Sequence, residues 1–167
     1  MSFIQSLIDN TPDSLPAPKG VQNLVVSRAY FGPTKGGTQD NPKPKRPMIT
    51  VHFGVADQDC DEISDFLVFP LSETDEASVI RLMNKRIKAF LLGCGIDGEN
   101  FQDIPVDNYS PEMEEPIELN WAGATCWAQI KHEIRDGETF AQVEKYLKPN
   151  EKVSPAPAAT EFTGPKA

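Results

Sequence analysis

The sequence has little of what marks secreted or membrane proteins. Its three cysteines are odd in number and far apart, which argues against a disulfide framework and favours a reducing compartment. No apolar run approaches the ~18 residues that a membrane-spanning helix needs. The N-terminus has neither a basic start nor a long apolar stretch, so it does not fit a signal peptide. We expect a soluble, cytoplasmic protein without a membrane partner.

Motifs for metals, cofactors and nucleotides are also missing. There is no CxxC or HxxxH spacing and no glycine-rich loop followed by Lys-Ser/Thr. Asp57, Asp59 and Asp61 begin like a calcium loop. However, Glu62 stands where that loop needs glycine, and Val68 where it needs glutamate. The other carboxylates cluster in turns and linkers, which disfavours a two-metal nuclease. We expect a binding protein that is not an enzyme and has no cofactor.

Positive charge is scarce, with 16 Lys and Arg against 25 Asp and Glu and a net charge of −9. Such a balance disfavours binding to phosphate backbones. The acids are concentrated, however, because residues 57–79 and 97–118 each carry eight carboxylates and no cation. Outside these blocks 16 cations face nine carboxylates, so a locally cationic surface is compatible with the sequence.

Composition divides the chain into three parts. Residues 1–19 join a short apolar stretch at helical spacing to a proline-rich linker, which predicts a small docking helix. Residues 20–149 hold the regular patterns and form the expected domain. Residues 150–167 have the composition of a disordered tail.

Within the domain, the patterns predict strands over 20–31, 48–57 and 63–71 and a helix beginning with Thr74 as N-cap. Its apolar stripe comprises Val79, Leu82, Met83, Ile87, Phe90 and Leu91, and Gly93 or Gly95 ends it. Residues 97–117 are acidic and proline-rich and predict a long connection.

Residues 121–149 predict two further strands joined at Asp136-Gly137. Alternation on the first of them gives a core face and an outward face. The core face holds Ala124, Cys126, Ala128, Ile130 and Ile134, and the outward face holds Trp127, Gln129, Lys131, Glu133 and Arg135. An outward aromatic with two cations suits a sheet that stacks bases and binds phosphates, although a solvated sheet face has the same pattern.

The element order is three strands, one helix and two strands. It predicts an all-β fold with one helix, a five-stranded Greek-key barrel of the OB-fold type with flexible N- and C-terminal segments. Other small α+β sheets share this order and stay open as alternatives.

Candidate binding residues lie on the first loop and on the outward strand faces. The loop between the first two strands carries four cations and one carboxylate, Asp40: Lys35, Lys43, Lys45 and Arg46. This loop is either a cationic clamp that closes over a phosphate backbone or an ordinary solvated loop. Alternation turns His52, Trp127, Phe140 and Tyr146 outward, whereas the phase of the first strand is ambiguous. Trp121 fits a packing role at the rim better than a ligand contact.

Three stretches carry a resemblance to a known family: PMITVHFGV, RIKAFLLGCGI and WAGATCWAQIKHEIRDGETFAQVEKYLKP. The chain resembles small phage-encoded OB-fold proteins that bind single-stranded DNA beside replication and recombination functions. The resemblance implies a groove across the outward faces of strands one, two, four and five, with the 32–47 loop as clamp. Its residues here would be Arg28, Tyr30, His52, Trp127, Lys131 and Arg135.

The leading hypothesis is therefore sequence-independent binding of single-stranded DNA, with RNA as an alternative ligand. The family implies replication or recombination proteins as partners, and the sequence leaves homo-oligomerisation open. The tail end ATEFTGPKA is near neutral and differs from the acidic recruitment tails of such proteins. The alternative is a non-enzymatic protein-interaction or virion structural module, an inhibitor or assembly factor, that uses the acidic surface.

Overall fold

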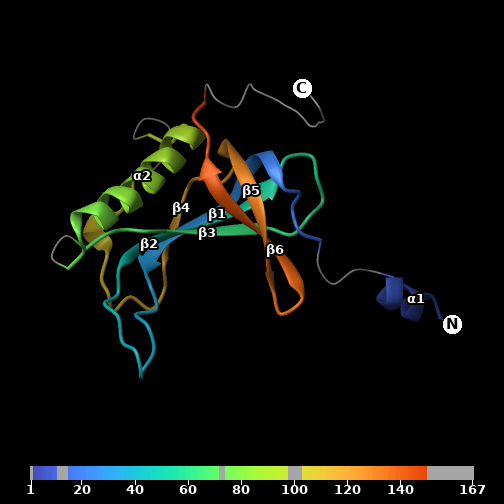
Figure 1. Ribbon diagram of the computed structural model, residues 1–167, viewed down its shortest axis with the longest axis horizontal. Coiled ribbons are helices and arrows are strands. Elements are labelled where there is room, and N and C mark those ends of the chain that lie inside the picture. Colours follow the sequence, from blue (N-terminus) through green and yellow to red (C-terminus); the bar gives the residue numbers. More distant parts are fainter. Residues whose placement is uncertain (1, 11–14, 72–73, 98–102, 150–167) are drawn as a thin grey trace.

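The computed structural model describes residues 2–10, 15–71, 74–97 and 103–149, which form one six-stranded antiparallel sheet and two helices (Figure 1). The mostly-β architecture expected from the sequence is confirmed at this level. Helix α1 (Phe3–Asn10) lies where a short N-terminal helix was expected. The expected disordered tail at 150–167 lies outside the described residues. Within them, neither helix combines the length and apolar character needed to cross a bilayer.

The sheet contains five long strands and one short addition. In chain order its strands are β1 (Gly20–Pro33), β2 (Pro47–Val55), β3 (Ile63–Val68), β4 (Ile117–Leu119), β5 (Thr125–Arg135) and β6 (Glu138–Tyr146). The spatial order is β3-β2-β1-β5-β6. One edge of β1 is shared, because its first half pairs with β5 and its second half with β4.

Helix α2 (Ala77–Cys94) packs against the sheet and contacts β3, β5 and β6. Phe90 carries this contact. Its ring centroid lies 5.3 Å from that of Tyr146, 5.8 Å from that of Trp121 and 6.1 Å from that of Phe53. Trp121 is fully buried, which confirms its expected packing role. Aromatic rings at these separations fill the core between helix and sheet.

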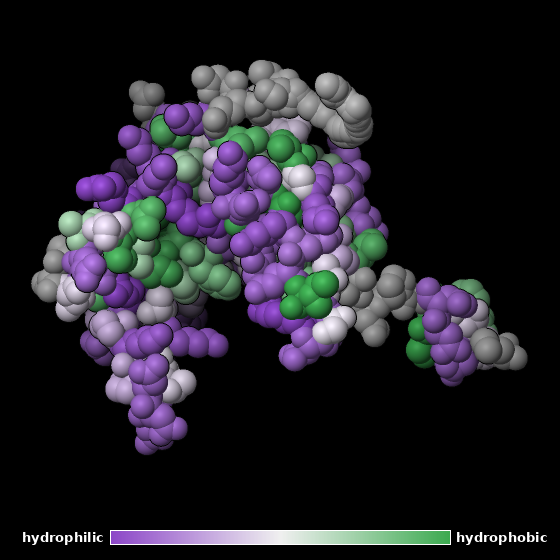
Figure 2. All heavy atoms as spheres, in the orientation of Figure 1, coloured by the Kyte–Doolittle hydropathy of each residue, from purple (hydrophilic) through white to green (hydrophobic). Residues whose placement is uncertain are grey.

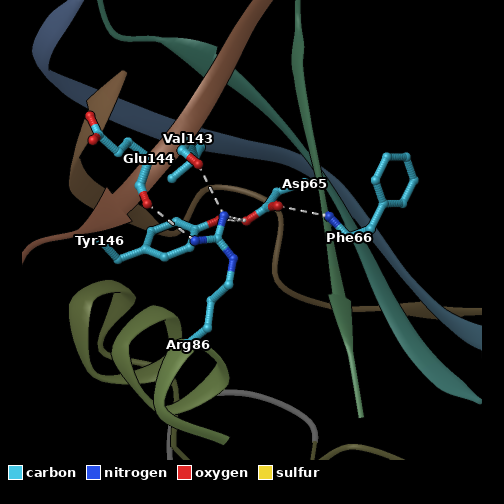
Figure 3. Close-up of polar contacts among 6 residues, drawn as sticks. All are labelled: Asp65, Phe66, Arg86, Val143, Glu144 and Tyr146. Carbon is cyan, nitrogen blue, oxygen red and sulfur yellow. Dashed lines mark hydrogen bonds and ion pairs between the residues drawn. The ribbon is translucent and has the colours of Figure 1, made fainter. Parts of the chain in front are cut away.

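The two end strands, β3 and β6, lie next to each other across a seam that α2 bridges (Figure 3). Arg86 reaches up from the helix, and its Nη2 donates to Asp65 Oδ2 on β3 at 2.8 Å and to the Val143 carbonyl on β6 at 3.1 Å. The Tyr146 hydroxyl donates to the same Asp65 carboxylate. Burial, with the nearby Asp65 charge, raises the pKa of Tyr146 well above its usual value. In the described residues no ladder pairs these strands, so side chains hold the sheet in a barrel-like curve.

Strand β6 departs from the predicted alternation. Ala128 pairs with Tyr146 and Ile130 with Val143, so Glu144 is an extra residue on β6. This bulge shifts the phase by one position. The prediction that Tyr146 faces outward is therefore wrong, because it points into the core between Phe53 and Phe90 rings.

The predicted faces of β5 hold along its first half. Ala124, Cys126, Ala128 and Ile130 are buried, as expected. Ile134 was expected in the core but is 72% exposed, because the end of the β5–β6 hairpin extends beyond the body. The predicted turn is confirmed, since both Asp136 and Gly137 have positive φ angles (51° and 80°). Such angles characterise a type I′ two-residue hairpin turn.

Helix α2 begins at Ala77 rather than just after Thr74. Asp75 is not part of the first turn, because its carboxylate accepts hydrogen bonds from Arg46 and from the Leu71 amide. The end at Gly95 is as expected, with φ of 65°. Only part of the predicted apolar stripe reaches the core, since Ile87 and Phe90 are buried whereas Leu82 is 68% exposed.

The acidic connection before the last hairpin packs on β1 over its described part. A short 3-10 turn (Val106–Asn108) is followed by Tyr109, whose ring centroid lies 5.7 Å from that of Phe31. Strand β4 then pairs with β1. The segment was predicted as a connection only, and it adds a sixth strand.

Candidate functional site

A β-bulge in β1 decides which side chains face outward. Leu24 and Val26 are buried before it, and Ala29 and Phe31 after it, because Ser27 has no partner in the β1–β2 register. The sequence left open which of two alternating sets of β1 residues faces the core. The strand uses one set before the bulge and the other set after it. The shift turns Arg28 and Tyr30 to the outer face.

Arg28, Tyr30 and His52 meet on this outer face. Arg28 and His52 are paired in the register, and the Tyr30 and His52 rings form an edge contact with centroids 6.3 Å apart. His52 Nδ1 lies 2.8 Å from Ser64 Oγ on β3. Burial lowers the pKa of His52, and the Arg28 charge lowers it further. The ring is therefore neutral at neutral pH and acts as a stacking or hydrogen-bonding group rather than as a cation.

Arg28 is held by a carboxylate from the β2–β3 connection. Its Nη2 lies 2.9 Å from Glu62 Oε1, with both side chains about half exposed. The Ser27 hydroxyl lies 2.7 Å from Glu62 Oε2. The hydrogen bond from Ser27 and the interactions with Arg28 lower the pKa of Glu62. Glu62 is therefore ionised at neutral pH and offsets the charge of Arg28.

Trp127 lies on the same outer side of the sheet but away from this group. It is half-buried and pairs with Asn23 on β1, five residues before Arg28. At ~3.3 Å per residue this separates the two positions by about 16 Å along the strand. Lys131 and Arg135 continue the outer face of β5 toward the hairpin turn, and both are exposed.

A groove of about 600 Å³ lies between the edges of β3 and β6. Lys131 and Arg135 line it, and so do two aromatic residues, Phe66 on β3 and Phe140 on β6. Arg135 stacks over the Phe140 ring at 4.4 Å. Four carboxylate residues also line the groove: Asp61, Glu62, Asp65 and Glu144. Asp65 is occupied by Arg86 and Tyr146, so part of this negative charge is compensated.

Phe66 was not assigned to the site from the sequence, whereas Phe140 was predicted to face outward but was not among the named groove residues. Phe66 is 54% exposed and Phe140 is 38% exposed. In Figure 3 the Phe66 ring points away from the network around Asp65. The outward position of Phe66 could have been predicted from the sequence. Ile63 and Leu67 are both core residues of β3 and are an even number of positions apart. Phe66 is adjacent to Leu67, so its side chain points to the opposite, outer face.

The loop between β1 and β2 forms an arm without regular secondary structure, apart from one isolated bridge between Gly37 and Pro42. It projects from the same side of the body as the β5–β6 hairpin (Figure 1), and its tip is hydrophilic (Figure 2). Backbone hydrogen bonds join Thr34 to Arg46 and Lys43 to Gly36. Gly37 has a φ of 84°, and a Cβ there would lie 2.4 Å from the Asn41 carbonyl oxygen, so the turn requires glycine.

The four cations of this arm fall into two classes. Lys35, Lys43 and Lys45 are exposed, and within the described residues they make no ion pair. Arg46 is half-buried at the base of the arm and binds Asp75 through both terminal nitrogens, with Nη2 at 2.7 Å from Oδ1. This bidentate pair anchors the arm to the start of α2.

The predicted site residues therefore form separate groups. Arg28, Tyr30 and His52 lie together on β1 and β2, and Lys131 and Arg135 line the groove at the hairpin. The three arm lysines and Trp127 lie apart from both groups. This arrangement places aromatic faces and exposed lysine charges along an extended path.

No cluster of three or more His, Cys, Asp or Glu side chains suited to a metal ion occurs in the described part of the chain. A scan against protein-family models and a search of curated proteins both give no match to this chain. The class of protein is therefore inferred from the fold and the geometry of the site.

Proposed function

We propose that the protein binds single-stranded DNA without sequence preference, as an OB-fold barrel of phage replication or recombination. The observation that carries the proposal is the groove between β3 and the β5–β6 hairpin, which Phe66, Phe140, Lys131 and Arg135 line. Exposed aromatic rings beside cations are the parts that stack bases and neutralise phosphates.

The strand order supports the OB-fold component of this proposal. A helix between the third and the next long strand, and a first strand paired on both sides, agree with that topology. The contact between β3 and β6 through Asp65 and Arg86 brings the ends of the sheet together, as a barrel needs. The β1–β2 arm and the β5–β6 hairpin then correspond to the two loops that flank an OB-fold ligand.

In the proposed mechanism no covalent chemistry takes place. Bases stack on Phe66, Phe140 and Trp127, whose faces accept any base. Lys131 and the three arm lysines contact phosphates and release counterions, which adds affinity but no base specificity. Arg135 stacks on the Phe140 ring and also carries a positive charge. It would therefore connect the base-stacking contacts with the phosphate contacts.

Phe66 offers a direct test. Phe66→Ala should weaken binding of an oligo-dT strand by about 1–3 kcal/mol, the usual loss for one base-stacking side chain. Val106→Ala is the matched control, because Val106 is 59% exposed on the far connection and outside the groove. Equal affinities of Phe66→Ala and wild type, measured by fluorescence anisotropy, would contradict this assignment.

One observation favours a second candidate, an acidic protein-interaction module. Arg28 and Arg46 are already paired with Glu62 and Asp75, and the groove carries four carboxylate residues. Under this alternative the acidic surface binds a basic partner. Retention on heparin favours the DNA-binding proposal, whereas specific capture of a basic host protein without heparin retention favours the alternative.

A further inference from the structure

Helix α1 has an apolar stripe that is exposed among the described residues of the chain. Phe3, Ile4, Leu7 and Ile8 lie on one side of the helix and are between 55% and 83% exposed. Figure 2 shows α1 apart from the body, with hydrophobic atoms at its surface. An isolated helix of eight residues is marginal in water, because helices shorter than ~12–15 residues lack enough stabilising bonds. Such a helix is expected to form stably only when its stripe is packed.

A groove with matching properties lies beside α2. It has a volume of about 590 Å³ and is lined by Leu82, Ala89 and Leu92 of α2 and by Tyr146 at the end of β6. Leu82 and Leu92 are 68% and 53% exposed. The size is within the range of ordinary ligand grooves. Leu82 belongs to the part of the predicted helix stripe that does not reach the core, whereas Leu92 lies outside that stripe.

The charges of the two surfaces are complementary. The groove is rimmed by cationic side chains: Lys85, Arg86, Lys88, Lys145 and Lys148. The sequence of residues 2–18 contains Asp9 and Asp13 and no lysine or arginine. Helix α1 carries an apolar stripe and one carboxylate, Asp9, so it fits an apolar groove with a lysine rim, as in helix-in-groove recognition.

We propose that α1 of one copy docks into the α2 groove of a second copy of this chain. Helices α1 and α2 of the same copy lie on opposite sides of the body (Figure 1). Leu15 is fixed on the body by Asp61, whose amide donates to the Leu15 carbonyl and whose carboxylate accepts from the Leu15 amide. The chain from Asn10 to Leu15 spans at most about 18 Å when fully extended. This short tether favours a groove on a neighbouring molecule, and the proposal does not depend on DNA binding.

Sedimentation velocity of the full chain, freed of nucleic acid, tests this docking. We expect concentration-dependent self-association, which Leu7→Asp on α1 or Leu82→Asp in the groove each weaken by about tenfold or more in Kd. Ile134→Asp is the control, because Ile134 is 72% exposed on the hairpin and outside both surfaces. Since these side chains are exposed in a single copy, circular dichroism should show that all three variants fold.

Mixing the two variants gives the sharpest outcome. A Leu7→Asp copy keeps an intact groove and a Leu82→Asp copy keeps an intact helix, so the mixture should form a one-to-one complex that neither variant forms alone. A wild-type protein that stays monomeric at its highest soluble concentration would overturn the proposal. Loss of association in Leu82→Asp but not in Leu7→Asp would also overturn it, because the groove would then pair with something other than α1.

Discussion

At the residue scale, the electrostatics of the outer face depend on which cations already have partners. Arg28 is neutralised by Glu62, Arg46 anchors the arm through Asp75, and Arg86 holds the seam through Asp65. Lys35, Lys43, Lys45 and Lys131 make no ion pair within the described residues. These lysines are thus the side chains that would exchange solvent ions for DNA phosphates.

Glu62→Gln should strengthen binding of single-stranded DNA. Glutamine retains the polar contact with Ser27 but loses the charge that holds Arg28, which then becomes available for a phosphate. One additional phosphate contact should steepen the slope of log K against log salt by about 0.7. The measurement is an anisotropy titration with oligo-dT at several salt concentrations.

Glu115→Gln removes the same charge from the exposed acidic connection and serves as the control. It should leave the slope close to that of wild type. An identical effect of both substitutions would show that only the net charge matters and that Arg28 is not part of the site.

At the element scale, helix α2 joins the two end strands of the sheet. Arg86 connects Asp65 of β3 with two carbonyl groups of β6, and Tyr146 contacts the same aspartate. Other neighbouring strands of the sheet are joined by backbone hydrogen bonds. At the seam between β3 and β6, side-chain contacts take their place. The groove proposed to bind DNA opens along this seam, so its shape depends on Arg86.

Arg86→Ala should lower the free energy of unfolding by about 1–3 kcal/mol, because it leaves a largely buried Asp65 carboxylate without its charged hydrogen-bond donor. Urea unfolding measures this loss. Arg81→Ala, on the exposed side of the same helix, is the control for removing one arginine. Unfolding free energies within ~0.5 kcal/mol for the two variants would argue against a structural role of the seam.

The Asp75–Arg46 pair should give the protein a pH-dependent stability in acid. Hydrogen bonds from Arg46 and from the Leu71 amide lower the pKa of Asp75 from 3.8 to about 2. Because the folded state binds the proton more weakly, the stabilisation is complete above the usual pKa and is lost as the pH falls from about 4 toward 2.

Asp75→Asn should accordingly reduce the melting temperature at neutral pH, and the difference from wild type should shrink as the pH falls through that range. Asp40→Asn, in the exposed tip of the same arm, controls for the loss of one carboxylate. A difference between wild type and Asp75→Asn that is constant with pH would contradict the role given to the ion pair.

The sequence predicted elements well and strand phases less well. Alternation identified the buried residues Cys126, Ala128 and Ile130, since regular pairing preserves a period of two. A bulge at Ser27 and another at Glu144 each add one unpaired residue, and this reverses which side chains face inward. Alternation alone cannot show such an insertion, because it depends on the register with the neighbouring strand.

At the scale of the whole molecule, the candidate site is distributed along a path. The predicted cations and aromatics occupy the arm, the outer sheet face and the hairpin. The composition of the first loop identified its candidate cations, and alternation along the strands identified the candidate aromatics. Their grouping, and the contribution of Phe66, depend on how β3 lies against β6, which is a contact between distant parts of the chain.

The two tryptophans give the whole-molecule claim a direct optical signal. Trp121 is fully buried against Phe90, whereas Trp127 is partly exposed on the outer face of β5. A base that stacks on the outer face can therefore quench Trp127 without disturbing the core. A change in tryptophan fluorescence would report on the proposed surface.

The most direct test is a fluorescence titration with oligo-dT over a range of salt concentrations. The account predicts quenching of Trp127 and an association constant that falls with salt. The slope of log K against log salt should lie between about −2 and −3.5 for three to five phosphate contacts. Absence of binding at ~50 mM salt, where electrostatic contacts are strong, would contradict the proposed function. So would binding whose affinity does not change with salt.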